Sequence, residues 1–72
     1  MTEFILHCCS RYGSPRFSVP LIWEEMDEHG RNCALTVGKV LNLRESHFRV
    51  ASVVEDVPGK VEITALRQIP LH

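Results

Sequence analysis

Hydrophobic and polar residues alternate along most of the second half of this chain. Three segments show this period of two, at residues 34–43, 47–55 and 60–69. Alternation is typical of β-strands, because successive side chains point to opposite faces of a sheet. Residues 44–46 (Arg-Glu-Ser) and residues 57–60 (Val-Pro-Gly-Lys) have turn-forming composition and separate the three segments. The pattern therefore predicts an antiparallel meander of three strands.

The predicted strands have one mainly apolar face and one mixed face. In the middle segment, Phe48, Val50 and Val54 fall on one face, while Ala51 and Val53 fall on the other. A strand of this kind belongs to a sheet that packs on one side and meets water on the other. We therefore expect a single layer of sheet, with another part of the chain packed on its apolar face.

The first half is less regular. Residues 4–9 are apolar and rich in strand formers, and residues 10–15 gather Ser, Gly and Pro, so we expect a strand followed by a turn. Residues 18–30 fit a helix, in which Ser18 is the N-cap, Pro20 lies in the first turn and Gly30 ends the helix.

The same region also fits a strand over residues 16–25. Phe17, Val19, Leu21 and Trp23 alternate with polar residues or proline, except that Ile22 breaks the pattern, and Pro20 would restrict such a strand to the edge of a sheet. We favour the helix. The predicted fold is then α+β, a small antiparallel sheet in the order β-α-β-β-β with one helix packed on its apolar face. The alternative is an all-β, five-stranded barrel of the SH3-like or OB-like kind.

Composition describes a small globular protein. The 72 residues are 44% hydrophobic and 24% charged, so we expect one domain, residues 1–72, with a small core. The net charge of −1 creates no overall attraction to nucleic acid or to an anionic membrane. No apolar run approaches the roughly 20 residues that span a bilayer, and the N-terminus lacks a basic signal-peptide region, so we expect a cytoplasmic protein without membrane contact.

Cysteine and histidine give weak signals of chemistry. An odd count of three cysteines argues against a disulfide framework. The residues His7, Cys8, Cys9, His29 and Cys33 have the side chains that zinc prefers, but adjacent cysteines do not aim two thiolates at one ion. A Cys/His nucleophile would need a lowered thiol pKa and a cleft, and the sequence indicates neither. We therefore predict no metal, no cofactor and no enzymatic activity.

An acidic segment with apolar residues inside it is the first candidate site. It comprises Trp23, Glu24, Glu25, Met26, Asp27 and Glu28. A solvated helix face would explain the charges alone, whereas a tryptophan and a methionine framed by carboxylates resemble the anchor of a protein interface. The sequence thus favours a small, non-enzymatic protein-interaction module. It would act as a regulator, inhibitor or accessory subunit on a larger protein, as small proteins of phages and mobile elements do.

The second candidate is a nucleic-acid-binding barrel. Its basic residues would be Lys39, Arg44, Arg49 and Arg67. The alternation allows Arg49 and Arg67 to share a sheet face with Lys39, and Tyr12 or Phe17 would stack a base. Homodimerisation through exposed sheet edges is compatible with either function and stays open at this point.

Overall fold

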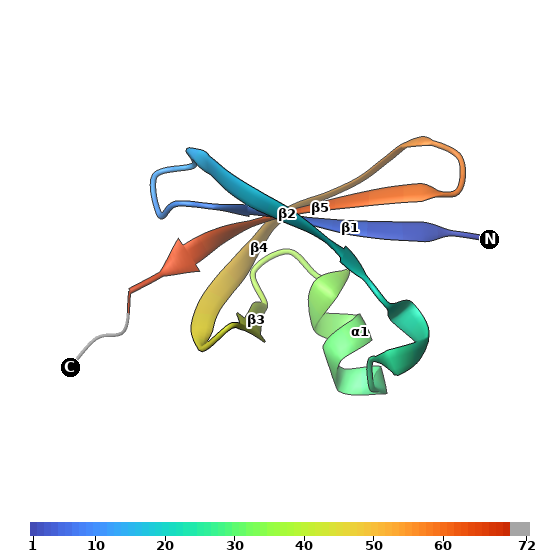
Figure 1. Ribbon diagram of the computed structural model, residues 1–72, viewed down its shortest axis with the longest axis horizontal. Helices are drawn as coiled ribbons and strands as arrows, with labels where there is room; N and C mark the ends of the chain where they lie inside the picture. The colour runs from blue at the N-terminus through green and yellow to red at the C-terminus, as the bar shows by residue number, and fades with distance from the viewer. Residues whose placement is uncertain (70–72) are drawn as a thin grey trace.

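The computed structural model describes residues 1–69, which form one curled, five-stranded sheet with a helix against it (Figure 1). The strands are β1 (Glu3–Cys9), β2 (Pro15–Leu21), β3 (Val40–Leu43), β4 (Ser46–Val57) and β5 (Lys60–Gln68). Between β2 and β3 lie a 3₁₀ turn, η1 (Trp23–Glu25), and the helix α1 (Glu28–Ala34). The strand order is β2-β1-β5-β4-β3, so β2 and β3 are the edges of an open half-barrel.

The predicted meander is confirmed, because β3 pairs with β4 and β4 with β5 in antiparallel register. β1 and β2 form an antiparallel hairpin. However, β1 and β5 run parallel, with Leu6 opposite Ile63, so the sheet is mixed and the expectation of an antiparallel sheet is corrected. Two parallel neighbouring strands cannot be joined by a tight turn. Here the chain between β1 and β5 is long and includes the crossover through η1 and α1, which lets β5 return beside β1 in the same direction.

The helix predicted over residues 18–30 is wrong except at its last three residues, because residues 18–21 belong to β2 and residues 23–25 to the 3₁₀ turn η1. Phe17, Val19 and Leu21 alternate toward the core from β2, and Pro20 is tolerated because β2 is an edge strand. The helix begins only at Glu28. Gly30 does not end it but lies in its first turn. The observed order is therefore β-β-α-β-β-β, an α+β arrangement with one helix, placed later in the chain than predicted, and with the five strands of the alternative fold.

The strand expected over residues 34–43 is shortened by the helix. Ala34 is the last residue of α1 and is fully buried, and strand pairing begins only at Val40. A β-bulge after Val50 also shifts the register of β4. Because one extra residue reverses the alternation of side chains, Val53 packs against the core and Val54 is 40% exposed, opposite to the faces predicted for them.

The core lies between the concave face of the sheet and the segment that carries η1 and α1. Leu6, Val50, Ile63 and Ala65 are at most 1% exposed, and Trp23 packs against this cluster from η1. Within the described chain no polar or charged side chain is buried. Charged groups therefore lie at the surface, where the curl of the sheet decides which of them come together.

Candidate functional site

An open groove lies at the end of the sheet opposite the N-terminus. The β1–β2 turn, the β3–β4 turn and the end of β5 enclose it, and its volume is about 980 Å³. We call it the arginine groove, and its principal lining residues are Arg11, Tyr12, Arg16, Phe17, Arg44 and Arg67. The volume is at the upper end of the range of sites that hold drug-sized ligands, about 300–1,000 Å³. The groove can therefore take a group as large as a nucleotide.

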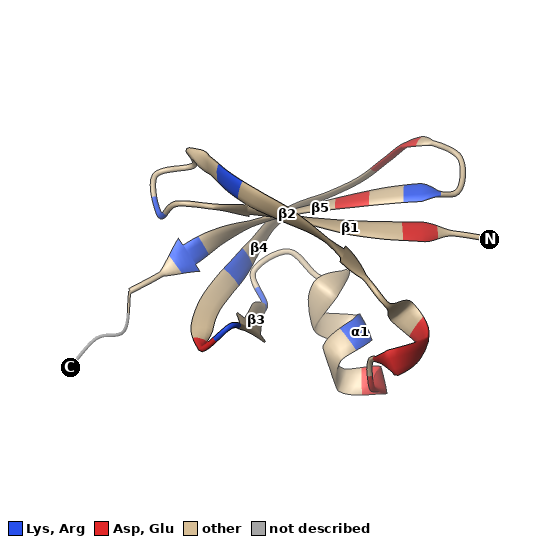
Figure 2. Ribbon diagram, viewed as in Figure 1, with Lys and Arg blue, Asp and Glu red and all other residues tan. Residues whose placement is uncertain are grey.

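The arginine groove has a strong excess of positive charge. Its lining contains four arginines and no aspartate or glutamate. Figure 2 shows most of the basic residues over this end of the sheet, and acidic ones over η1 and the start of α1, at the start of β1, on β5 and in the β3–β4 turn. Among residues 1–69 the only ion pair within 4.0 Å joins His7 and Glu62, outside the groove. Within residues 1–69, no carboxylate oxygen therefore lies within 4.0 Å of the four guanidinium groups.

Arg44 reaches the groove from a strained turn. Residues 44 and 45 connect the paired residues Leu43 and Ser46, and both have positive φ, 51° at Arg44 and 64° at Glu45. A two-residue hairpin turn of this type normally carries Asn-Gly, because a Cβ atom is unfavourable at positive φ. The Arg44 guanidinium lies 4.8 Å from the centre of the Phe17 ring. The turn thus holds a positive charge over an aromatic surface of the groove.

Strand register explains the position of Arg67. It is opposite Phe48, whose side chain is buried on the concave face, so Arg67 shares that face where the sheet ends. Phe48 in turn contacts Phe17 edge-on, with 6.2 Å between the ring centres. The groove therefore has an aromatic floor that is continuous with the core and positive side chains around it.

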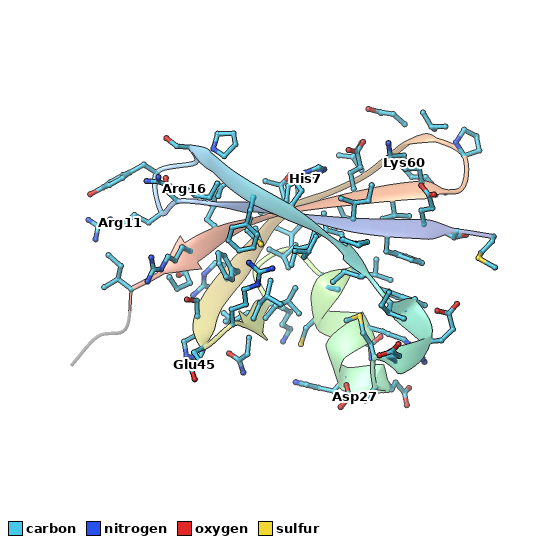
Figure 3. The ribbon with its side chains drawn as sticks, in the orientation of Figure 1. His7, Arg11, Arg16, Asp27, Glu45 and Lys60 are labelled. Atoms are coloured by element: carbon cyan, nitrogen blue, oxygen red, sulfur yellow. The ribbon has the colours of Figure 1, made fainter. Side chains whose placement is uncertain are left out.

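Arg11 and Arg16 enter the groove from the β1–β2 hairpin. Arg11 lies in the turn, and Arg16 lies next to a β-bulge that shifts the register between Cys8 and Cys9 (Figure 3). Sequence reasoning did not select these two arginines. The available signal was their position on either side of the predicted turn at residues 10–15, since a hairpin brings such residues to the same end of a sheet.

The predicted nucleic-acid set is only partly brought together. Arg44 and Arg67 line the groove, whereas Lys39 lies in the loop before β3 and does not. Arg49 faces the opposite side of the sheet from Arg67, because it is opposite Leu66 in the β4–β5 register. It donates to the Gly38 carbonyl oxygen at 2.9 Å and to Gln68 Oε1 at 3.2 Å, so its role is to tie the edge of the sheet.

The acidic segment is placed at the other end of the molecule. The Trp23 ring stacks on Phe4, with centres 3.8 Å apart and planes inclined by 7°, and Met26 also packs on the core. Asp27 is the N-cap of α1, because its carboxylate accepts a hydrogen bond from the Gly30 N–H at 2.7 Å. Glu24, Glu25 and Glu28 are exposed. Trp23 and Met26 are thus half-buried and contribute to the packing of the fold.

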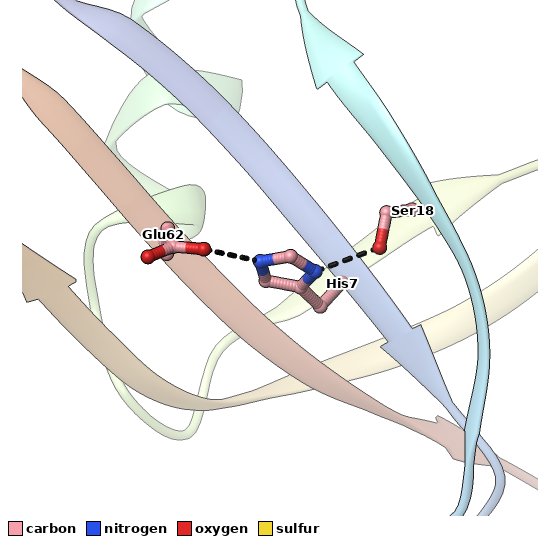
Figure 4. Close-up of polar contacts among 3 residues, drawn as sticks. All are labelled: His7, Ser18 and Glu62. Carbon is pink, nitrogen blue, oxygen red and sulfur yellow. Dashed lines mark hydrogen bonds and ion pairs between the residues drawn. The ribbon is translucent and has the colours of Figure 1, made fainter.

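A polar network crosses the convex face of the sheet (Figure 4). His7 on β1 contacts Ser18 Oγ through Nδ1 at 2.7 Å and Glu62 Oε1 through Nε2 at 2.9 Å. The order serine, histidine, carboxylate matches that of an activated nucleophile. However, acyl transfer also needs donors aimed at an oxyanion, and the contacts among these three mid-strand side chains supply none. The network is best described as a link between β2, β1 and β5.

The cysteines have the properties of core residues. Burial, and then the neighbouring Cys9 thiol, raise the pKa of the Cys8 thiol, while Arg44 opposes this rise. A raised pKa keeps the thiol protonated and unreactive at neutral pH. Cys33 Sγ lies 3.6 Å from His29 Nε2. Within residues 1–69, no three side chains of the metal-binding types converge on one point.

Comparison of the chain with protein-family models, with curated proteins and with solved structures finds no match. In the part of the chain that the structure describes, no helix has the length and apolar character needed to cross a membrane. The chemistry of the arginine groove must therefore be argued from its own residues.

Proposed function

We propose that the protein is a non-enzymatic binding module whose arginine groove holds single-stranded nucleic acid. The observation that carries the proposal is the convergence of four arginines, without a single carboxylate, around a nucleotide-sized concave surface. Guanidinium groups bind phosphate through paired N–H donors, and single-strand-binding proteins combine such a basic channel with aromatic surfaces.

The aromatic content of the groove favours a single strand over a duplex. Phe17 and Tyr12 line the same surface as the arginines. A duplex would present phosphates and sugars to this surface, whereas the bases of a single strand are free to cover apolar and aromatic groups. Phosphate contacts would supply most of the affinity, so binding should depend steeply on salt.

The first test replaces one groove arginine. Fluorescence anisotropy with a labelled oligothymidylate should show that Arg67→Ala weakens binding about tenfold, equivalent to about 1.4 kcal/mol. The slope of log affinity against log salt should also fall by about 0.7, the value for one phosphate contact on a single strand. An oligouridylate of equal length tests whether RNA or DNA is preferred.

Lys60 provides the matched control. It carries the same charge but begins β5, at the opposite end of that strand from the groove (Figure 3). Lys60→Ala should therefore leave both affinity and salt slope nearly unchanged. The proposal is wrong if wild-type protein does not bind either oligonucleotide at low salt, or if the two variants lose affinity equally.

A second candidate is binding of a basic protein partner through the acidic segment, which would make the module a regulator, inhibitor or accessory subunit. The observation that favours it is the exposure of Glu24, Glu25 and Glu28 beside Ile22, whose side chain is 52% exposed. Asp27 is left unchanged in the test because it caps α1, and its replacement would also destabilise the helix.

Affinity purification of the tagged protein, with and without nuclease, tests this candidate. A partner that persists after nuclease treatment should be lost when Glu24, Glu25 and Glu28 are replaced by lysine. The same triple variant should retain the wild-type circular dichroism spectrum, since none of the three carboxylates is buried. A partner that survives the triple replacement would eliminate this surface.

A further inference from the structure

Tyr12 is exposed where an aromatic ring is normally covered. It lies in the β1–β2 turn at the edge of the arginine groove, and its side chain is 80% exposed. Among residues 1–69 the other aromatic side chains are buried or half-buried. Because a tyrosine ring has a large apolar surface to remove from water, this one is placed for contact with another molecule.

Hydrogen bonds made by residues before and after Tyr12 hold the turn that carries it. Ser10 Oγ accepts from the Tyr12 N–H at 3.3 Å and from the Ser14 N–H at 3.1 Å. Backbone bonds join the Ser10 N–H to the Ser14 carbonyl at 2.8 Å and the Gly13 N–H to the Ser10 carbonyl at 2.9 Å. The backbone at Tyr12 is thus fixed before any ligand arrives, which lowers the entropy lost on binding.

Arg11 lies against the ring of Tyr12. Its guanidinium carbon is 4.7 Å from the ring centre, within the range of a cation–π contact. The contact limits the motion of the tyrosine side chain and places a positive charge next to it. A base stacked on the ring would therefore have a phosphate-binding group within reach of its own nucleotide.

We propose that Tyr12 stacks a nucleobase of the strand whose phosphates the groove arginines hold. This inference rests on the proposed function and adds a second recognition element to it. The arginines bind the charge of the phosphates, whereas Tyr12 binds the bases. Base–aromatic stacking is tolerant of sequence, because every base has a π-face. The module should thus prefer unpaired, base-bearing strands without selecting a particular sequence.

The test compares two labelled oligonucleotides of equal length and charge, an oligothymidylate and the same backbone without bases. Wild-type protein should bind the thymidylate about 5- to 140-fold more tightly, the range that corresponds to stacking of one base. Tyr12→Ala should bind both ligands with the affinity that wild-type protein has for the abasic strand. Tyr12→Phe keeps the ring and should keep the preference.

The outcomes separate this inference from the proposed function. Equal binding of both strands by wild-type protein, or a preference that survives Tyr12→Ala, overturns the role of Tyr12 while the arginine groove stands. Failure of wild-type protein to bind either strand overturns both. Because Tyr12 is exposed and lies outside the core, the variants should fold as the wild type does.

Discussion

At the scale of single residues, the strained pair Arg44–Glu45 is the clearest sign of function. Left-handed backbone costs an ordinary residue about 1–2 kcal/mol, and both residues of this turn adopt it. Glycine would remove that strain at either position. Strain of this kind concentrates at binding sites, and here it positions Arg44 in the groove.

Replacing Glu45 by glycine should stabilise the protein. The gain from relieved strain is partly offset by the greater flexibility of glycine in the unfolded chain, which leaves about 0.5–1 kcal/mol. For a domain of this size that raises the melting temperature by about 2–8 °C, which thermal unfolding followed by circular dichroism would measure. Arg44 is untouched, so oligonucleotide binding should persist.

Glu45→Ala is the control for this prediction, because alanine removes the charge but keeps the Cβ atom at positive φ. Its free energy of unfolding should stay within about 0.5 kcal/mol of the wild type. Equal stabilisation by alanine and glycine would show that loss of the glutamate side chain, rather than relief of backbone strain, is the cause.

At the scale of elements, the sequence predicted those strands and turns that depend only on residues close together in the chain. The β3–β4–β5 meander and its Pro58–Gly59 turn follow from alternation and turn chemistry, and Gly59 has the positive φ, 84°, that this turn needs. The region around Pro20 supports two interpretations, because the apolar residues suit a strand and the acidic ones a helix. Pairing with β1, a contact distant in sequence, made its first part a strand.

The site was less predictable than the fold, because it is assembled by long-range pairing. Arg11 and Arg67 are distant in sequence, and only the parallel alignment of β1 with β5 brings the ends of these strands together. A bulge then decides which face Arg16 joins. Register also separates Arg49 from Arg67, which alternation alone had allowed on one face. The grouping of these arginines depends on how the strands are aligned with one another, and the sequence of one strand does not determine that alignment.

At the scale of the whole molecule, the distribution of charge matters more than its sum. A net charge of −1 suggests little attraction to a polyanion, yet the fold collects four arginines around the groove at one end, while most carboxylates, Glu45 in the β3–β4 turn excepted, lie away from it (Figure 2). The molecule measures 41 × 25 × 18 Å, and the Debye length at physiological salt is about 8 Å. Charges at the two ends therefore act on a ligand independently.

Chromatography on heparin, a polyanion, tests this separation with two variants of equal net charge. Arg44→Ala/Arg67→Ala and Lys39→Ala/Lys60→Ala each remove two positive charges, which takes the formal net charge from −1 to −3. The arginine pair lines the groove and the lysine pair does not. We expect wild-type protein to bind at low salt, the lysine variant to elute near it and the arginine variant to flow through. If both variants lose retention to the same extent, then net charge governs the attraction and the groove does not focus it.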